Sequence, residues 1–412
     1  MERQQVVELL LQFLNENGFV RTQAALEAES RLRFEPDQVK VASQLQVILD
    51  LYEATHGDPS KKPRKMDISD LLVQPTATIP TQNVFTVQDL HTGPVLAARL
   101  RDDMKLFTGS SDKTAALAQF SDLDDEYRWY RDNTLTHHSG AVLAVEFHPL
   151  LKNIALTSSM DRSHQIVDIE TGDVLQTFAD HTKFVVRVQW SPNGEYFATA
   201  SYDHHVGLYR RVQKVSKPVE DDDDSDAEEE PAPFKFERVG HFLFEGYAEA
   251  LCFSPEGDEL CMAARNDCFL HFVELTSGNY ERSKMNMNAL GDTHVSFTAL
   301  DVSYSPFGKK YLLVCTDKNR LILYARETGE QLRHFYGTNN DEWSTPRHCW
   351  HPSGQYIFAT SQDRCIYIWE MCSQKLVGKL TGHTENIRDL SFNDKHKILV
   401  STGFDKVVRF WK

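Results

Sequence analysis

The segment Gly382–Lys412, which reads GHTENIRDLSFNDKHKILVSTGFDKVVRFWK, decides the fold of this chain. Within it, His383 lies 22 positions before Asp405, and Trp411 follows that aspartate by six. Apolar residues gather in three short runs, at Ile387–Phe392, Ile398–Val400 and Val407–Phe410. Runs of this length, separated by polar residues, predict three β-strands.

The same pattern recurs in seven units from residue 83 onward. Each unit has an aspartate in a predicted tight turn, and most have a histidine about 22 residues before it. In chain order these residues are His91 with Asp112, His138 with Asp161, His181 with Asp203, Asp267, His294 with Asp317, Asp363, and His383 with Asp405. Successive aspartates are 49, 42, 64, 50, 46 and 42 residues apart. A period of roughly 40–45 residues with short strands predicts a β-propeller, in which each unit forms one blade.

The units resemble WD repeats, with Trp411 followed by lysine where that family has Trp-Asp. The resemblance implies an all-β, seven-bladed propeller over residues 83–412. It also implies that a histidine, a serine or threonine, the aspartate and a tryptophan form a hydrogen-bonded set that braces each blade. We assign this role to the histidines and aspartates above and to Ser201, Trp369 and Trp411. Gly403 occupies the expected serine position of the last unit, so we expect no blade to have the complete set.

The last unit has only three predicted strands, whereas a propeller blade has four. Residues Asn83–Gln88 alternate apolar and polar side chains just before His91. We expect this stretch to pair with Val407–Phe410 and to close the ring, because closure removes an open sheet edge that would favour aggregation.

Residues 1–35 predict two short helices. Apolar residues repeat at helical spacing, Asn17-Gly18 ends the first helix, and Thr22 can cap the second. Helices of this length cannot bury their apolar faces alone. The stretch resembles the LisH (Lis-homology) motif, which implies homodimerisation; the alternative is a helical hairpin docked on its own propeller. The residues expected at the dimer interface are Val6, Leu9, Leu10, Phe13, Leu14, Phe19, Ala25 and Leu26.

Two further segments carry predictions. Residues 36–82 indicate an amphipathic helix followed by a linker, and the basic cluster Lys61–Lys65 is either a nuclear import signal or solvated charge. Residues 212–236 include nine acidic residues between positions 220 and 230, so like-charge repulsion predicts a disordered insertion. Within it, Ser225 is a phosphorylation candidate, unless the insertion only increases solubility.

The composition argues against several classes of protein. The net charge of −16 argues against a protein that coats nucleic acid, and no apolar stretch approaches the roughly 20 residues that cross a bilayer. The seven cysteines include no CxxC pair and no zinc spacing, so we expect reduced thiols, no metal, and a location in the cytoplasm, the nucleus or both. The sequence also lacks GxxxxGKS/T, GxGxxG and HExxH, which favours a protein without catalytic residues or cofactors.

The surface around the channel is the remaining candidate for function. In WD repeats, the residue before each turn aspartate and those after each histidine face solvent there. The residues before the aspartates are Ser111, Met160, Tyr202, Asn266, Thr316, Gln362 and Phe404. Aromatic residues and arginines dominate protein-binding hot spots. We therefore expect partner binding by the following residues, unless the aromatic ones are packed in the core: Lys183, Phe184, Arg187, Tyr202, Tyr247, Trp343, Arg347, Arg388 and Phe404.

The resemblance to LisH/WD-repeat scaffolds implies a non-catalytic scaffold or adaptor. Such a protein homodimerises and binds proteins or peptide motifs, without direct nucleic-acid or membrane binding. Two alternatives remain open. One is a substrate-receptor or scaffold subunit of a ubiquitin ligase, although the sequence has no Trp-Asp for the Trp-Asp-x-Arg pattern of cullin-linked receptors. The other is a subunit of a nuclear chromatin or RNA-processing complex, which rests on Lys61–Lys65 alone.

Overall fold

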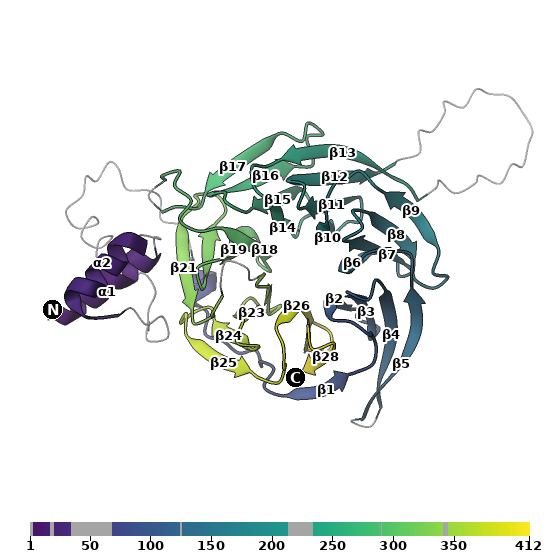
Figure 1. Cartoon of the computed structure of the whole chain (residues 1–412), viewed down its shortest axis with the longest axis horizontal. Coiled ribbons are helices and arrows are strands. Elements are labelled where there is room, and N and C mark those ends of the chain that lie inside the picture. Colours follow the sequence, from purple (N-terminus) through teal and green to yellow (C-terminus); the bar gives the residue numbers. More distant parts are fainter. Residues whose placement is uncertain are drawn as a thin grey trace, which may run out of the picture.

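The computed structural model describes residues 3–16, 20–33, 68–123, 126–212, 234–289, 291–340 and 345–412. From residue 83 onward, these residues form seven four-stranded sheets arranged in a ring (Figure 1). The predicted all-β, seven-bladed propeller is therefore confirmed.

Six blades use four consecutive strands, which follow one another from the channel outward. Blade one has β2 (Val95–Leu100), β3 (Lys105–Ser110), β4 (Ala115–Leu123) and β5 (Glu126–Leu135). Blade two has β6 (Val142–Phe147), β7 (Ile154–Ser159), β8 (His164–Asp168) and β9 (Val174–Phe178). Blade three has β10 (Val185–Trp190), β11 (Tyr196–Ser201), β12 (His205–Arg211) and β13 (Phe236–Leu243).

The next three blades have the same order. Blade four has β14 (Ala248–Phe253), β15 (Glu259–Ala264), β16 (Phe269–Glu274) and β17 (Arg282–Asn286). Blade five has β18 (Ala299–Ser305), β19 (Gly308–Thr316), β20 (Arg320–Ala325) and β21 (Gln331–Tyr336). Blade six has β22 (His348–Trp350), β23 (Tyr356–Thr360), β24 (Ile366–Glu370) and β25 (Leu376–Leu380).

Blade seven joins the two ends of the propeller segment. Its strands are β26 (Ile387–Asn393), β27 (Ile398–Gly403), β28 (Val408–Trp411) and β1 (Asn83–Val87). β1 pairs antiparallel with β28, so that Phe85 lies opposite Phe410 and Val87 opposite Val408. The pairing expected from the alternation of residues 83–88 is confirmed, and it closes the ring.

The apolar core lies between neighbouring blades. β11 is buried at all of its positions, because the adjacent blades cover both of its faces. One core cluster joins Leu156 and Ile166 of blade two to Phe197 and Tyr209 of blade three. The outer strands are more exposed, as in β9 and β25, so apolar burial decreases from the channel outward.

Two helices precede the propeller, α1 (Arg3–Glu16) and α2 (Val20–Ser30), and they lie outside the ring (Figure 1). On α1, Leu11 is buried, whereas Leu10 is 37% exposed. Nη1 of Arg320, at the start of β20, donates to the carbonyl oxygen of Asn15 at 3.3 Å, so α1 contacts blade five. Within the described ranges, every helix is too short or too polar to cross a membrane.

Residues 68–82 form a strap that lies against the propeller. The 3-10 helix η3 (Ser69–Leu72) places Leu71, which is 1% exposed, in a core cluster of blades five and six. The carboxylate of Asp70 accepts a hydrogen bond from Tyr311 Oη at 2.6 Å. The sequence predicted a linker up to residue 82, and the structure instead anchors this last part of it to the blades.

Several predictions fall outside the described residues or side chains. They concern the side chain of Val6, the residues Phe19, Trp343 and Ser225, the basic cluster Lys61–Lys65, and most of the insertion 212–236. At these positions the expectations from the sequence stay predictions.

Candidate functional site

Four blades are braced by a hydrogen bond between a histidine and an aspartate. The Nδ1–Oδ2 distances are 3.1 Å for His91–Asp112, 3.0 Å for His138–Asp161, 2.9 Å for His181–Asp203 and 2.8 Å for His383–Asp405. Because a carboxylate only accepts, Nδ1 donates, and Nε2 is left to accept from a hydroxyl. In the same order, that hydroxyl belongs to Thr108, Thr157, Thr199 and Ser401, at 2.7–2.9 Å.

The hydroxyl lies four residues before the aspartate rather than two. The reason is that the imidazole reaches past the turn and meets a residue inside the second strand of the blade. In blade three, Thr199 therefore holds His181, whereas Ser201 Oγ accepts a hydrogen bond from the backbone N–H of Asp203 at 3.2 Å. The assignment of Ser201 as the hydroxyl partner of the histidine is corrected accordingly.

Blade seven has the complete hydrogen-bonded set. Ser401 Oγ contacts Nε2 of His383 and also accepts from Trp411 Nε1 at 2.8 Å. The expectation that Gly403 leaves this blade incomplete is therefore wrong, because position 401 supplies the hydroxyl.

Two blades without this histidine hold their aspartates in another way. Asp267 lies 2.8 Å from His271 Nε2, and Asp363 accepts from Tyr367 Oη at 2.8 Å. In both cases the partner lies four residues after the aspartate, on the third strand of the blade. Trp369 Nε1 donates to a backbone carbonyl of β21 at 2.8 Å, so this tryptophan links blade six to blade five.

The expected pair of His294 and Asp317 does not form. His294 is exposed, and Asp317 Oδ1 accepts from the backbone N–H of Thr298 at 2.8 Å. The N–H of Asp317 also donates to the Thr298 carbonyl, which is the bond that Tyr202 makes to Phe184 in blade three. Asp317 therefore stands one position earlier in its turn than the aspartates of blades one, two, three, six and seven, and there it faces the backbone instead of a histidine.

The same backbone bond identifies the residue before the turn in blade four. The N–H of Arg265 donates to the carbonyl of Tyr247 at 2.8 Å. Arg265 and Asp317 thus occupy the surface positions that the sequence assigned to Asn266 and Thr316, and Thr316 is buried.

The paired histidines and aspartates act as braces within the blades. Both ring nitrogens of each histidine are engaged by the aspartate and the hydroxyl, which leaves none to abstract a proton from a substrate. Burial also lowers the pKa of His91 and of His138, so these rings are neutral near pH 7.

One group of side chains has the composition of a metal site. His164, Asp180 and His181 place their ligand atoms within 4.8 Å of one another. Both nitrogens of His181 are engaged within the blade, and Asp180 accepts from Tyr209 Oη at 2.7 Å and pairs with Arg238 at 3.1 Å. These hydrogen bonds already engage the ligand atoms of His181 and Asp180, so the cluster does not favour a metal.

Aromatic rings gather on the face that carries the turns. Phe184 and Tyr202 have ring centroids 6.4 Å apart, and Tyr202 stacks on Tyr247 at 4.9 Å. Lys183 Nζ lies 5.5 Å and the His204 ring 5.0 Å from the centroid of Tyr247. Phe184 and Tyr247 are each 40% exposed. These five residues, which we call the aromatic patch, join blades three and four.

A second exposed ring lies across the channel mouth. Phe404, in the turn of blade seven, is 45% exposed, and the guanidinium carbon of Arg388 lies 6.0 Å from its ring centroid. Burial and then Glu249 raise the pKa of Tyr202 to about 12, so its hydroxyl stays protonated.

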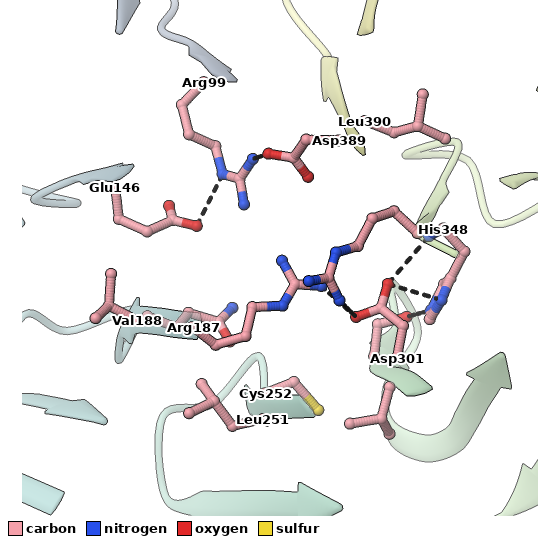
Figure 2. A pocket seen from close by; sticks show the side chains of 14 residues that line it. Arg99, Glu146, Arg187, Val188, Leu251, Cys252, Asp301, His348, Asp389 and Leu390 are labelled. Carbon is pink, nitrogen blue, oxygen red and sulfur yellow. Dashed lines mark hydrogen bonds and ion pairs between the residues drawn. The ribbon is translucent and has the colours of Figure 1, made fainter. Parts of the chain in front are cut away.

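The channel at the propeller axis is lined by the innermost strands of all seven blades (Figure 2). Its cavity has a volume of about 130 Å³. Arg99 lies between two carboxylates: its Nε donates to Glu146 at 2.8 Å, and its Nη1 donates to Asp389 at 2.6 Å. This arginine therefore ties blades one, two and seven together.

Asp301 is the centre of a second charged group in the channel. Its Oδ1 lies 2.5 Å from Arg187 Nη2 and 3.7 Å from Arg347 Nη1, and its Oδ2 accepts from the backbone N–H of His348 at 3.0 Å. Burial alone would raise the pKa of Asp301, but Arg187 and His348 lower it below the usual range. Arg347 was expected on the surface; it is 6% exposed and lines the channel, because it reaches inward to Asp301.

Sequence reasoning missed Arg99, Glu146 and Asp301. Each is a charged residue inside an otherwise apolar strand, and a buried charge is retained only where it is paired. That signal can be read in the sequence. The pairs themselves cannot, because their partners come from different blades.

Four segments of the chain match the model of the WD domain, G-beta repeat family. They are residues 129–168, 172–210, 330–370 and 374–412. The last of them contains the segment on which the fold prediction began. The chain therefore contains WD40 repeats, as the resemblance implied.

Several curated proteins are similar to parts of this chain. Nuclear distribution protein PAC1 of Komagataella phaffii is 30% identical over 108 residues, which are 26% of this chain and 21% of that protein. The U5 small nuclear ribonucleoprotein 40 kDa protein of Homo sapiens is 35% identical over 68 residues, 16% of this chain and 19% of that protein. COMPASS component SWD2 of Saccharomyces cerevisiae is 23% identical over 342 residues, 79% of this chain and 93% of that protein. The chain thus spans about a fifth of the length of the first two relatives.

Proposed function

We propose that this protein is a non-catalytic scaffold that homodimerises through residues 1–35 and binds protein partners on the turn face of its propeller. The aromatic patch is the observation that carries the proposal. Exposed rings beside a cation are the residue types that dominate protein-binding hot spots. Because stacking already orders the rings, little conformational freedom is lost when a partner binds.

Co-purification tests the binding face. The double variant Phe184→Ala/Tyr247→Ala is expected to lose protein partners that the wild-type chain retains, with an unchanged thermal unfolding midpoint. Phe307→Ala is the matched control, because Phe307 is also exposed but lies in the turn between β18 and β19, on the opposite face. A double variant that is folded and keeps every partner would contradict the proposal.

The dimer rests on α1 and α2. Leu10, an apolar residue of the predicted interface, is exposed in the single chain. An exposed apolar side chain is expected at a surface that a second copy of the chain covers in the dimer. Light scattering at micromolar concentration should give a dimer for the wild-type protein and a monomer for Phe13→Asp. Ala28→Asp, at an exposed position of α2 outside the predicted interface, should remain dimeric. A monomeric wild-type protein would contradict this part of the proposal.

A second candidate function is that of a subunit in a nuclear multiprotein complex. The names of two relatives favour it, since one is a component of a small nuclear ribonucleoprotein and the other a COMPASS component. Cell fractionation should then recover the chain in the nucleus, and the double variant Lys62→Ala/Arg64→Ala should reduce the fraction of the protein found there. Exclusion of the wild-type chain from the nucleus would contradict this candidate.

Ligase subunits among the co-purified proteins would instead support the ubiquitin-ligase alternative.

A further inference from the structure

Charge is distributed unevenly within the channel. Arg99 has two carboxylate partners, whereas Arg187 and Arg347 share the single carboxylate of Asp301. Arg388, on the innermost strand of blade seven, adds a third guanidinium beside Phe404 at the mouth, outside the set of residues that line the cavity. Burial lowers the pKa of Arg388, whereas Tyr202 and Glu249 raise it, so this arginine lies within electrostatic range of a carboxylate as well as of Arg187.

Arg347 and Arg388 each have a buried nitrogen that lacks an acceptor. Arg347 Nη1 lies 3.7 Å from Asp301, too far for a hydrogen bond, and it has no hydrogen-bond partner among the described residues. Arg388 Nε is also buried and without such a partner in the described part of the chain. A buried donor without an acceptor costs free energy. An acceptor that enters the cavity recovers this cost at Arg347, whose side chain lines it.

We propose that the channel mouth binds a carboxylate group of a partner protein, held by Arg187, Arg347 and Arg388. This inference rests on the proposed scaffold function and names the chemical group that the partner inserts. A planar carboxylate can accept two parallel hydrogen bonds from a guanidinium. The cavity is also lined by Asp301 and Asp389, which repel a dianion such as phosphate more strongly than a monoanion, so a carboxylate is favoured.

The exposed rings lie beside this mouth. The guanidinium carbon of Arg388 lies 6.0 Å from the ring centroid of Phe404, so this exposed ring lies directly beside one of the three arginines. An aspartate or glutamate flanked by apolar residues can therefore place its carboxylate in the channel while its neighbours pack on the rings. The partner segment that fits this face is acidic at one position and apolar beside it.

Acetate serves as the probe, because it carries the proposed group alone. Its methyl NMR resonance should broaden saturably with the full-length wild-type chain, over a millimolar range at constant ionic strength. Arg347→Gln and Arg388→Gln should each raise the Kd for acetate about tenfold or more. Arg388 is half-buried, so its variant tests the proposal even where Arg347→Gln does not fold. Arg162→Gln, at an exposed turn position of blade two, is the matched control and should bind acetate like the wild type.

Three results would overturn the inference. They are the absence of saturable broadening, tighter binding of inorganic phosphate than of acetate, and binding by Asp301→Asn but not by the wild type. In the last case Asp301 already fills the site. The acetate measurement needs no partner protein, so its failure is distinguishable from a failure of the scaffold proposal, which is read from co-purification.

Discussion

At the scale of the residue, polar side chains of the core form directed chains of hydrogen bonds. In blade seven, Trp411 donates to Ser401, Ser401 donates to His383, and His383 donates to Asp405. Each group has one partner that accepts and one that donates, except at the two ends. This direction requires that Nδ1 of His383 donates and that its Nε2 accepts.

Removal of the central hydroxyl should destabilise the propeller. Ser401→Ala leaves the Trp411 N–H and His383 Nε2 without a partner, and each buried unsatisfied group costs about 1–3 kcal/mol, so we expect a loss of about 2–6 kcal/mol. The free energy of unfolding in urea measures it. Ser139→Ala, at an exposed turn position, should change stability by less than about 0.5 kcal/mol. Equal effects of the two substitutions would contradict the role of Ser401.

His148 should make stability depend on pH. Its Nδ1 accepts from the backbone N–H groups of Leu150 and Leu151 at 3.1 and 3.0 Å, and burial lowers its pKa to about 4. In the unfolded chain this histidine has a pKa of about 6.5 and so binds the proton more readily. Stability from this residue is therefore complete above about pH 6.5 and decreases as the pH falls toward 4.

Urea unfolding midpoints at about pH 7 and about pH 5 check this pH dependence. His148→Asn is the matched variant, because its amide oxygen can accept the same two N–H groups without titrating. Its midpoint should change less with pH than that of the wild type. An equal change in both proteins would show that other groups dominate the pH dependence.

Spacing in the sequence located the residues of these hydrogen-bonded chains only in part. The distances between His383, Asp405 and Trp411 repeat along the chain and can be recognised without a structure. The hydroxyl cannot be located this way, because it depends on how far the imidazole reaches over the strand beneath it. Likewise, the spacing between His294 and Asp317 fits the repeat, although the turn that contains Asp317 is shifted by one residue.

At the scale of the element, the strap of residues 68–82 fastens the segment before the propeller to its blades. Leu71 fills a site in the core of blades five and six, and Asp70 binds Tyr311. Further along, the backbone N–H of Ala77 donates to Gln355 Oε1 at 3.0 Å. The sequence did not predict this docking, because Leu71 stands in a short apolar run, Leu71–Val73, and its partners lie far away in the chain.

A pair of adjacent leucines tests the strap. Leu71→Ala should destabilise the protein by about 2–4 kcal/mol, since it removes a fully buried side chain. Leu72→Ala is the matched control, because Leu72 is 53% exposed, and it should have almost no effect. The free energy of unfolding distinguishes them, and limited proteolysis should cleave the strap faster in Leu71→Ala. Equal stability of the two variants would mean that the strap is not anchored by Leu71.

At the scale of the whole molecule, stability depends on the junction between β1 and β28. The ring of Phe85 lies 6.0 Å from Phe120 of blade one and 6.0 Å from Phe410 of blade seven, measured between centroids. A single strand thus covers apolar side chains of two blades. The sequence predicted this junction because the alternation in residues 83–88 and the missing outer strand of blade seven complement each other.

Deletion of residues 83–90 should unfold the entire propeller rather than one blade. Without β1, both β28 and the core between blades seven and one are uncovered, so we expect an aggregated protein or one without a cooperative thermal transition. A deletion of residues 220–230, within the acidic insertion, should leave the transition intact. Circular dichroism with a thermal scan checks both, and a soluble, cooperatively folded protein without residues 83–90 would show that the junction is dispensable.

The closing strand also fixes an order of events during synthesis. On the ribosome, β1 is made before any other strand of the propeller, and β28 is made last. Until β28 emerges, Phe85 and Val87 have no partner strand, and blade one has no neighbour on that side. Contacts between residues so far apart in a chain form slowly and leave apolar surface exposed meanwhile. The nascent protein therefore completes its ring only after β28 has been synthesised, and a truncation within the final blade should prevent the entire ring from closing.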